Sequence, residues 1–206
     1  MSWILSIALH PLLMPTALFG IIAFQVPDIM NPLSNEGRMS VLFLIFLSTF
    51  VMPFLMILAM LVVSKKEFSL GNLQMSKAKE RFMPFFFTSI FYLVVTYYLF
   101  SSLNTVILLI MAGITASTFI TAVVSYFWKI SAHAVGINGV IGFLMALTWM
   151  YKENALLYPL VIIILLSGAL LSARLYLNAH TPAQVLWGAV LGFVSGVGSL
   201  GLIYFI

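Results

Sequence analysis

Hydrophobic residues along the chain gather in long runs that are separated by short polar stretches. Each run is roughly 17–25 residues long, the length with which an α-helix crosses the hydrocarbon core of a bilayer. Strands of a membrane barrel would instead show short segments of alternating polarity. The third run is short, so it is predicted either to span or to form a hairpin or tilted excursion. We therefore predict seven apolar helical segments, at about residues 2–25, 41–63, 84–100, 105–127, 135–150, 155–171 and 183–206.

Composition supports a membrane protein. Of the 206 residues, 63% are hydrophobic and 7% are charged, whereas a soluble domain has about 25% charged residues. Backbone polar groups inside a bilayer must bond to one another, which leaves helices as the solution for this pattern. The predicted fold is all-α: one polytopic transmembrane bundle of about six to seven helices over residues 1–206. We expect a multi-pass integral membrane protein, placed in a bacterial inner membrane.

Three further features of the composition exclude functions. The chain has no cysteine, which excludes disulfides, thiolate nucleophiles and cysteine-based zinc sites. Its formal charge of +4 is spread over the predicted loops, so no nucleic acid is expected as a partner. With five acidic residues in the whole chain, a two-metal phosphatase site is hard to build. We expect no metal and no cofactor.

Polar residues near the helix ends are the informative ones, because ionisable groups at membrane depth are costly and usually mark function. If all seven segments cross, three such clusters share one side of the bundle. The first cluster, 77–84, precedes the third segment. In a helix, Lys77 and Arg81 would lie one turn apart on one face. The alternative is a solvated basic loop that touches anionic headgroups.

The second cluster, 129–133, lies between the fourth and fifth segments. Ser131 can cap the following helix, whose N-terminal N–H groups can bind an anion. Lys129 adds positive charge, and His133 brings an imidazole. The alternative is a plain helix cap with a histidine at the interface.

The third cluster links the last two segments and contains Arg174, His180 and Gln184. Pro182 fits the first turn of the last helix, so His180 and Gln184 are about one turn apart and the amide can reach the imidazole. The alternative is a lone core histidine with a structural arginine. Taken together, two histidines, several cations and a hydroxyl favour metal-free phosphoryl transfer through histidine, since cations bind phosphate and a histidine can attack phosphorus.

These clusters resemble the motifs of the type 2 phosphatidic acid phosphatase superfamily, over Lys77 to about Gly192. That family has a Lys with an Arg-Pro pair, then Pro-Ser-Gly-His, then Ser-Arg, five residues, His, three residues and Asp. Here the second motif reads Ile130-Ser131-Ala132-His133, and the third reads Ala173-Arg174, five residues, His180, three residues and Gln184. The first motif is looser, because Pro84 follows Arg81 by three residues and Gln74 stands where the family has its Lys.

The resemblance implies a phosphatase-like core at about 77–206, preceded by two helices at about 2–25 and 41–63. It implies an integral-membrane enzyme that hydrolyses a lipid phosphate or diphosphate, of the phosphatidic acid or polyprenyl type, without metal. His180 would attack phosphorus and form a phosphohistidine, and His133 would protonate the leaving group and then activate water. The phosphoryl oxygens would be held by Arg174, Arg81 and Ser131, with weaker contributions from Lys77 and Lys129.

Gln184 replaces the aspartate with which the family orients its nucleophile. A glutamine oxygen can accept the imidazole N–H, but it cannot stabilise an imidazolium as a carboxylate does. This predicts a slower enzyme, an enzyme with another orienting group, or an inactive relative that binds lipid phosphate. A small transporter is a further alternative, although no convincing internal repeat supports it.

Two remaining features have structural interpretations. Gly188, Gly192 and Gly196 recur at intervals of four in the last segment, which favours close helix packing within one subunit over a dimer seam. His10 precedes Pro11, so we interpret it as a cap or helix-entry residue rather than a site ligand. If the first helix starts on the basic side, His10 would nevertheless line the site.

Overall fold

The computed structural model describes residues 2–63, 78–100 and 105–205, and within these ranges the chain is helical and contains no strand. All seven predicted segments are helices here. The elements are α1 (Ser2–Ala8), η1 (Pro11–Leu13), α2 (Met14–Gln25), η2 (Pro27–Met30), α3 (Asn35–Phe46), η3 (Leu47–Val51), α4 (Met52–Val63), α6 (Ala78–Phe100), α7 (Thr105–Phe127), α8 (Ala132–Tyr151), η4 (Asn154–Leu156), α9 (Leu157–Tyr176), α10 (Pro182–Gly201) and η5 (Leu202–Phe205).

Among the described residues, six helical stretches are long and apolar enough to cross a membrane. The helix α6 is not one of them, although it has 23 residues. It begins at Ala78, earlier than the predicted start at 84, because Ala78, Lys79 and Glu80 favour helix. Pro84 therefore lies inside the helix, past its first turn. The six stretches are Ser2–Gln25, Asn35–Met60, Thr105–Phe127, Ala132–Tyr151, Asn154–Tyr176 and Pro182–Phe205.

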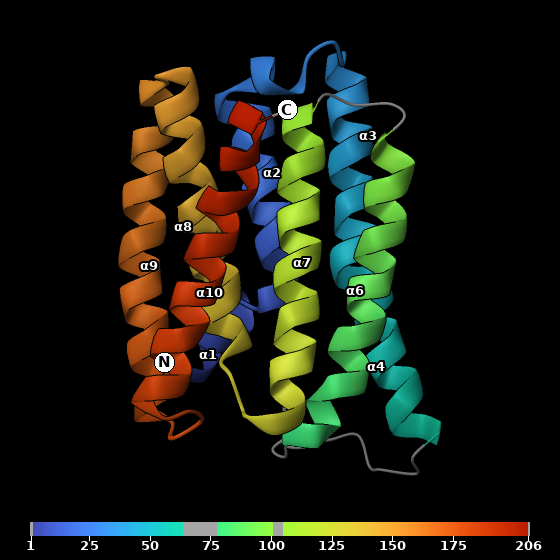
Figure 1. Ribbon diagram of the computed structural model, residues 1–206, viewed down its shortest axis with the longest axis vertical. Coiled ribbons are helices and arrows are strands. Elements are labelled where there is room, and N and C mark those ends of the chain that lie inside the picture. Colours follow the sequence, from blue (N-terminus) through green and yellow to red (C-terminus); the bar gives the residue numbers. More distant parts are fainter. Residues whose placement is uncertain (1, 64–77, 101–104, 206) are drawn as a thin grey trace.

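The long helices run side by side along the long axis of the molecule (Figure 1). The helix α10 packs most extensively on α8, and α6 packs on α7. The helix α2 supplies part of the interior, where Phe19 and Ile22 are fully buried. Many other apolar side chains face outward, such as Tyr97 and Leu165, as expected when lipid is the surrounding solvent.

Prolines break the first two segments. The first is divided at His10 and Pro11 into the short α1 and the longer α2. In the second, the π-helical turn η3 precedes Pro53, which has no N–H to donate to the carbonyl of Thr49. The hydroxyl of Tyr92 on α6 donates to that carbonyl at 3.0 Å, so the carbonyl is satisfied from another helix.

The glycines of the last segment lie against α8 within the same chain. A Cβ atom at Gly188 would stand 2.7 Å from the carbonyl oxygen of Ser131, and one at Gly196 would stand 2.7 Å from that of Gly139. At Gly192 a Cβ would overlap the carbonyl oxygen of Val135. All three glycines are buried. The spacing of four residues therefore allows the backbones of α10 and α8 to touch.

We expect Gly192→Ala to destabilise the protein by roughly 1–3 kcal/mol, as overpacking in a close contact does. The added methyl group meets backbone, which cannot turn away. Thermal unfolding in detergent measures the effect. Gly198→Ala on the same helix is the matched control, because a Cβ there meets nothing within 4 Å. Equal melting temperatures for the two variants would contradict the packing argument.

Candidate active site

The residues of the three polar clusters come together at one end of the bundle. The connection between α7 and α8, the connection between α9 and α10, and the start of α6 all lie at the lower end in Figure 1. A cavity of about 330 Å³ opens among them. Its ionisable lining side chains come from five different parts of the chain: His10, Arg81, His133, Arg174 and His180. The remainder of the described lining is largely apolar and contains no carboxylate.

His180 is buried, with 7% of its surface exposed, and its ring is held from one side. Its Nδ1 lies 3.1 Å from the backbone carbonyl oxygen of Lys129 and 3.3 Å from Oε1 of Gln184. A carbonyl oxygen can only accept a hydrogen bond, so in the neutral ring Nδ1 carries the proton. The other nitrogen, Nε2, then keeps its lone pair, which is the form that a nucleophilic or basic imidazole requires.

Gln184 has two contacts at once. Its side-chain oxygen accepts the backbone N–H of Thr181 at 3.1 Å, and Thr181 in turn accepts the N–H of Gln184 at 3.4 Å. This reciprocal pair is the capping box that begins α10. The predicted reach of the amide to His180 is present, but the nearer acceptor is the Lys129 carbonyl. The orienting group of His180 is therefore partly a backbone atom.

Arg174 lies in the last turn of α9 and is buried, with 5% of its surface exposed. Its Nη1 donates to Oγ of Ser6 at 3.2 Å, and its buried Nε has no hydrogen-bond partner among the described residues. Arg81, 8% exposed, lines the same cavity. Burying a guanidinium is costly unless its donors are paired. Two of them facing one cavity create a place where an anion is strongly favoured.

His133 and His10 stand next to each other in the cavity, with ring centroids 5.7 Å apart in an edge-on arrangement. Nε2 of His133 lies 3.0 Å from the carbonyl oxygen of Ser6, so it is the donor of that bond. Nδ1 of His10 accepts the backbone N–H of Leu12 at 3.3 Å. His10 is thus the cap of η1 that the sequence predicted, and it also lines the site.

Burial sets the charge state of the residues between the membrane-spanning helices. Desolvation first, and then the neighbouring cations Arg81 and Arg174, lower the pKa of His180 to about 4, against a smaller opposing effect of the Lys129 carbonyl. The pKa of Lys129 is also lowered, first by desolvation and then by the same two arginines. At neutral pH His180 is consequently an uncharged imidazole among cations.

The remaining predicted site residues lie around the cavity rather than in it. The hydroxyl of Ser131 is fully buried, caps α8 by accepting the N–H of Ala134 at 3.4 Å, and is not among the residues that line the cavity. Lys129 and Gln184 line an outer groove, which shares His180 with the cavity. Lys77 lies outside the described residues. Within the described ranges, no group of three or more metal-ligating side chains is arranged around a common point.

Three site contacts were missed by the sequence reasoning. Ser6 bonds to Arg174 through its hydroxyl and to His133 through its carbonyl. The Lys129 carbonyl orients His180. Backbone atoms leave no signal in a sequence, and Ser6 is one of many serines in apolar runs. The sequence did hold one signal for the contribution of the first segment: the break at His10 and Pro11 marks where this segment reaches the end of the bundle that holds the polar clusters.

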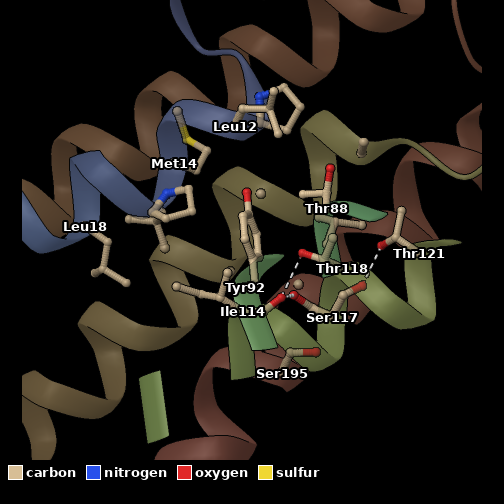
Figure 2. A pocket seen from close by; sticks show the side chains of 18 of the residues that line it. Leu12, Met14, Leu18, Thr88, Tyr92, Ile114, Ser117, Thr118, Thr121 and Ser195 are labelled. Atoms are coloured by element: carbon tan, nitrogen blue, oxygen red, sulfur yellow. Dashed lines mark hydrogen bonds between the residues drawn. The ribbon is translucent and has the colours of Figure 1, made fainter. Parts of the chain in front are cut away.

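A second cavity of about 70 Å³ adjoins the first and shares Leu12 and Thr88 with it (Figure 2). It is lined mainly by apolar side chains between α2, α7 and α8. Two of its hydroxyl groups donate to carbonyls of their own helix, Thr118 to Ile114 at 2.8 Å and Thr121 to Ser117 at 2.7 Å. The second cavity is therefore apolar in character, in contrast to the cavity that holds the histidines.

Comparison with known proteins adds no family assignment: no family model, no curated protein and no solved structure matches the chain.

The lowered pKa of His180 predicts a pH-dependent stability. The unfolded chain takes up a proton near pH 6.5, whereas the folded protein does so only near pH 4. The unfolded state binds more protons in this window, so the free energy of unfolding falls as the pH drops from 6.5 to 4. The contribution of His180 amounts to about 3 kcal/mol at most.

Histidine nitrogen resonances of ¹⁵N-labelled protein in detergent measure the protonation state of His180 directly. We expect the His180 signal to remain that of the Nδ1–H neutral form at pH 5.5. His180→Gln should remove part of the acid sensitivity of the melting temperature. A His180 resonance that titrates at about pH 6.5, as an ordinary histidine does, would show the assignment to be wrong.

Proposed function

We propose that the chain is an integral-membrane lipid phosphatase of the type 2 phosphatidic acid phosphatase kind, acting on a lipid phosphate or diphosphate without metal. The observation that carries this proposal is the convergence of His133, His180, Arg81 and Arg174 on one cavity. These residues come from motifs up to about a hundred positions apart in the sequence, and they are the positions that the resemblance selects. The phosphatase-like core at 77–206 and the bacterial inner membrane belong to this proposal.

The charges of the cavity support an anionic substrate. Arg81 and Arg174 are buried beside apolar side chains, and the described lining offers them no carboxylate. A phosphoryl group supplies the oxygens that guanidinium groups bind best. Apolar residues such as Trp3, Phe54 and Ile57 line the rest of the cavity. This combination suits a phosphate head that is attached to a hydrocarbon chain.

The proposed reaction has two steps. In the first, the lone pair of His180 Nε2 attacks phosphorus, the bond to the lipid oxygen breaks, and that oxygen receives a proton from His133. In the second, water attacks the phosphohistidine, gives a proton to His133, and inorganic phosphate leaves. Because Nε2–H of His133 bonds to the Ser6 carbonyl, Nδ1 is the nitrogen that exchanges the proton: His133 enters the first step as the imidazolium, gives up the Nδ1 proton to the lipid oxygen, and regains it from water in the second step. Arg81 and Arg174 bind the phosphoryl oxygens throughout.

A second candidate function is a catalytically weak or inactive relative that binds lipid phosphate. One observation favours it: the oxygen of Gln184 is shared between His180 and the Thr181 N–H of the capping box. No carboxylate among the described residues lies at this position to stabilise a protonated His180. Binding of phosphate without release of phosphate from any lipid would support this second candidate.

We expect His180→Gln to lower phosphate release from a short-chain phosphatidic acid or farnesyl diphosphate by roughly 10²-fold or more, because the nucleophile is removed. Purified protein in detergent, with phosphate measured colorimetrically, provides the assay. Acid lability of ³²P trapped on the wild-type protein, with stability in alkali, would identify the phosphohistidine. Full activity of His180→Gln would rule out this nucleophile.

Arg174→Gln should lower kcat/KM by about 10²-fold, since a charge-assisted contact to the phosphoryl group is lost. Arg38→Gln is the matched control. Arg38 lies at the start of α3, bonds to Asn35, and belongs to the opposite end of the bundle (Figure 1). The control should retain wild-type kcat/KM. An equal loss in both variants would point to a general effect of removing positive charge.

A further inference from the structure

His10 lies outside the region that the resemblance covers, which begins at Lys77, so no role is carried over to it. The structure nevertheless brings it into the cavity of Arg81, Arg174, His133 and His180. It stands between α1 and η1, where the break at Pro11 turns the chain. Its ring is 5.7 Å from that of His133, centroid to centroid. The first segment therefore contributes an imidazole to a site whose other ionisable side chains come from α6, α8, α9 and the connection between α9 and α10.

The hydrogen bond of His10 to the backbone determines its tautomer. The donor is the N–H of Leu12, so Nδ1 of His10 must hold a lone pair. In the neutral ring the proton is then on Nε2. This is the reverse of His180, whose Nδ1 faces acceptors. The two rings are therefore complementary: His180 offers a lone pair at Nε2, and His10 offers an N–H at Nε2.

An uncharged donor suits this position. Arg81 and Arg174 already place two positive charges at the cavity, and a third cation would repel them. A neutral imidazole adds a hydrogen bond to an anion without that repulsion. His133 cannot offer its Nε2–H in the same way, because that group bonds to the Ser6 carbonyl. His10 is the neighbouring ring whose Nε2 proton is not used by the backbone.

We propose that His10 binds the phosphoryl group directly, with its Nε2–H donating to a phosphoryl oxygen, while its Nδ1 caps η1. This inference rests on the proposed function for the identity of the ligand, a phosphate anion. It assigns to the first helical segment a part of the phosphate site, beside the arginines of α6 and α9.

The test uses the full chain in detergent micelles, labelled with ¹⁵N-histidine, and inorganic phosphate as the probe. We expect phosphate to shift the Nε2 resonance of His10, which is assigned by its disappearance in His10→Asn. We also expect His10→Asn to weaken phosphate binding by about tenfold, the loss of one hydrogen bond to a charged group.

The choice of asparagine separates the two roles of His10. Asparagine is among the best N-cap residues, so His10→Asn keeps an acceptor for the Leu12 N–H and should keep the melting temperature near that of the wild type. His10→Ala loses both roles and should lower affinity and melting temperature together. Ser34→Ala removes the cap of α3 at Gly37 without approaching the cavity. It should lower the melting temperature alone.

Several outcomes would overturn the inference. Wild-type phosphate affinity in His10→Asn, or a His10 resonance that does not move with phosphate, would show that His10 is a cap only. If His10→Asn is too unstable to measure, the His10 resonance is assigned by elimination with variants of His133 and His180, the other two of the three histidines, and its shift in the wild type decides. A protein that binds phosphate with a shifted His10 signal but releases none from lipids supports this inference and contradicts the enzymatic proposal. An active enzyme with an unmoved His10 signal contradicts only the inference.

Discussion

The contact between α8 and the start of α10 is the constraint on which the site depends. Gly188 lies so close to the Ser131 carbonyl that a side chain would not fit. At the same place the N–H of Ser131 donates to the carbonyl of Gln184 at 3.2 Å, and the Lys129 carbonyl receives Nδ1 of His180. Packing of small residues and backbone hydrogen bonds thus fix the two histidine-bearing segments against each other. In a bilayer, where apolar burial between helices provides little driving force, such close contacts are what hold helices together.

Buried cations give the site its chemical character. Arg81 and Arg174 come from helices that are separated in the sequence, and both are nearly removed from solvent. Their repulsion and desolvation act against folding. The bond from Arg174 to Ser6 offsets part of this cost. Burial of His180 and, after it, the same cations lower the pKa of its imidazole, so the cations that oppose stability also help to keep a lone pair available at neutral pH.

The helical fold was predictable because, inside a bilayer, the backbone polar groups of every apolar run must form hydrogen bonds within the protein. The glycine spacing also identified the close face of α10. The grouping of Arg81, His133, Arg174 and His180 followed from their placement at one end of the bundle. The roles of single side chains were less accessible. Ser131 was expected both to cap α8 and to hold the anion, and the structure shows the cap, with the residue outside the cavity lining. The Lys129 carbonyl, which orients His180, is a backbone atom that no residue type reveals. His10 was interpreted as a cap, and only the three-dimensional path of the chain shows that a cap can also face the cavity.

Several hydroxyl groups that line the second cavity already donate hydrogen bonds within the protein, and this affects how solvent can reach His180. Thr118 and Thr121 bond to their own helices, and the Tyr92 hydroxyl is taken by the Thr49 carbonyl. These groups give a water molecule little to hold in the interior. The groove that includes Lys129, Asn178 and Thr181, in contrast, carries polar side chains and shares His180 with the larger cavity. The imidazole of His180 thus lies where a largely apolar cavity meets a groove with polar side chains, so we expect solvent to reach it from the groove rather than through the bundle.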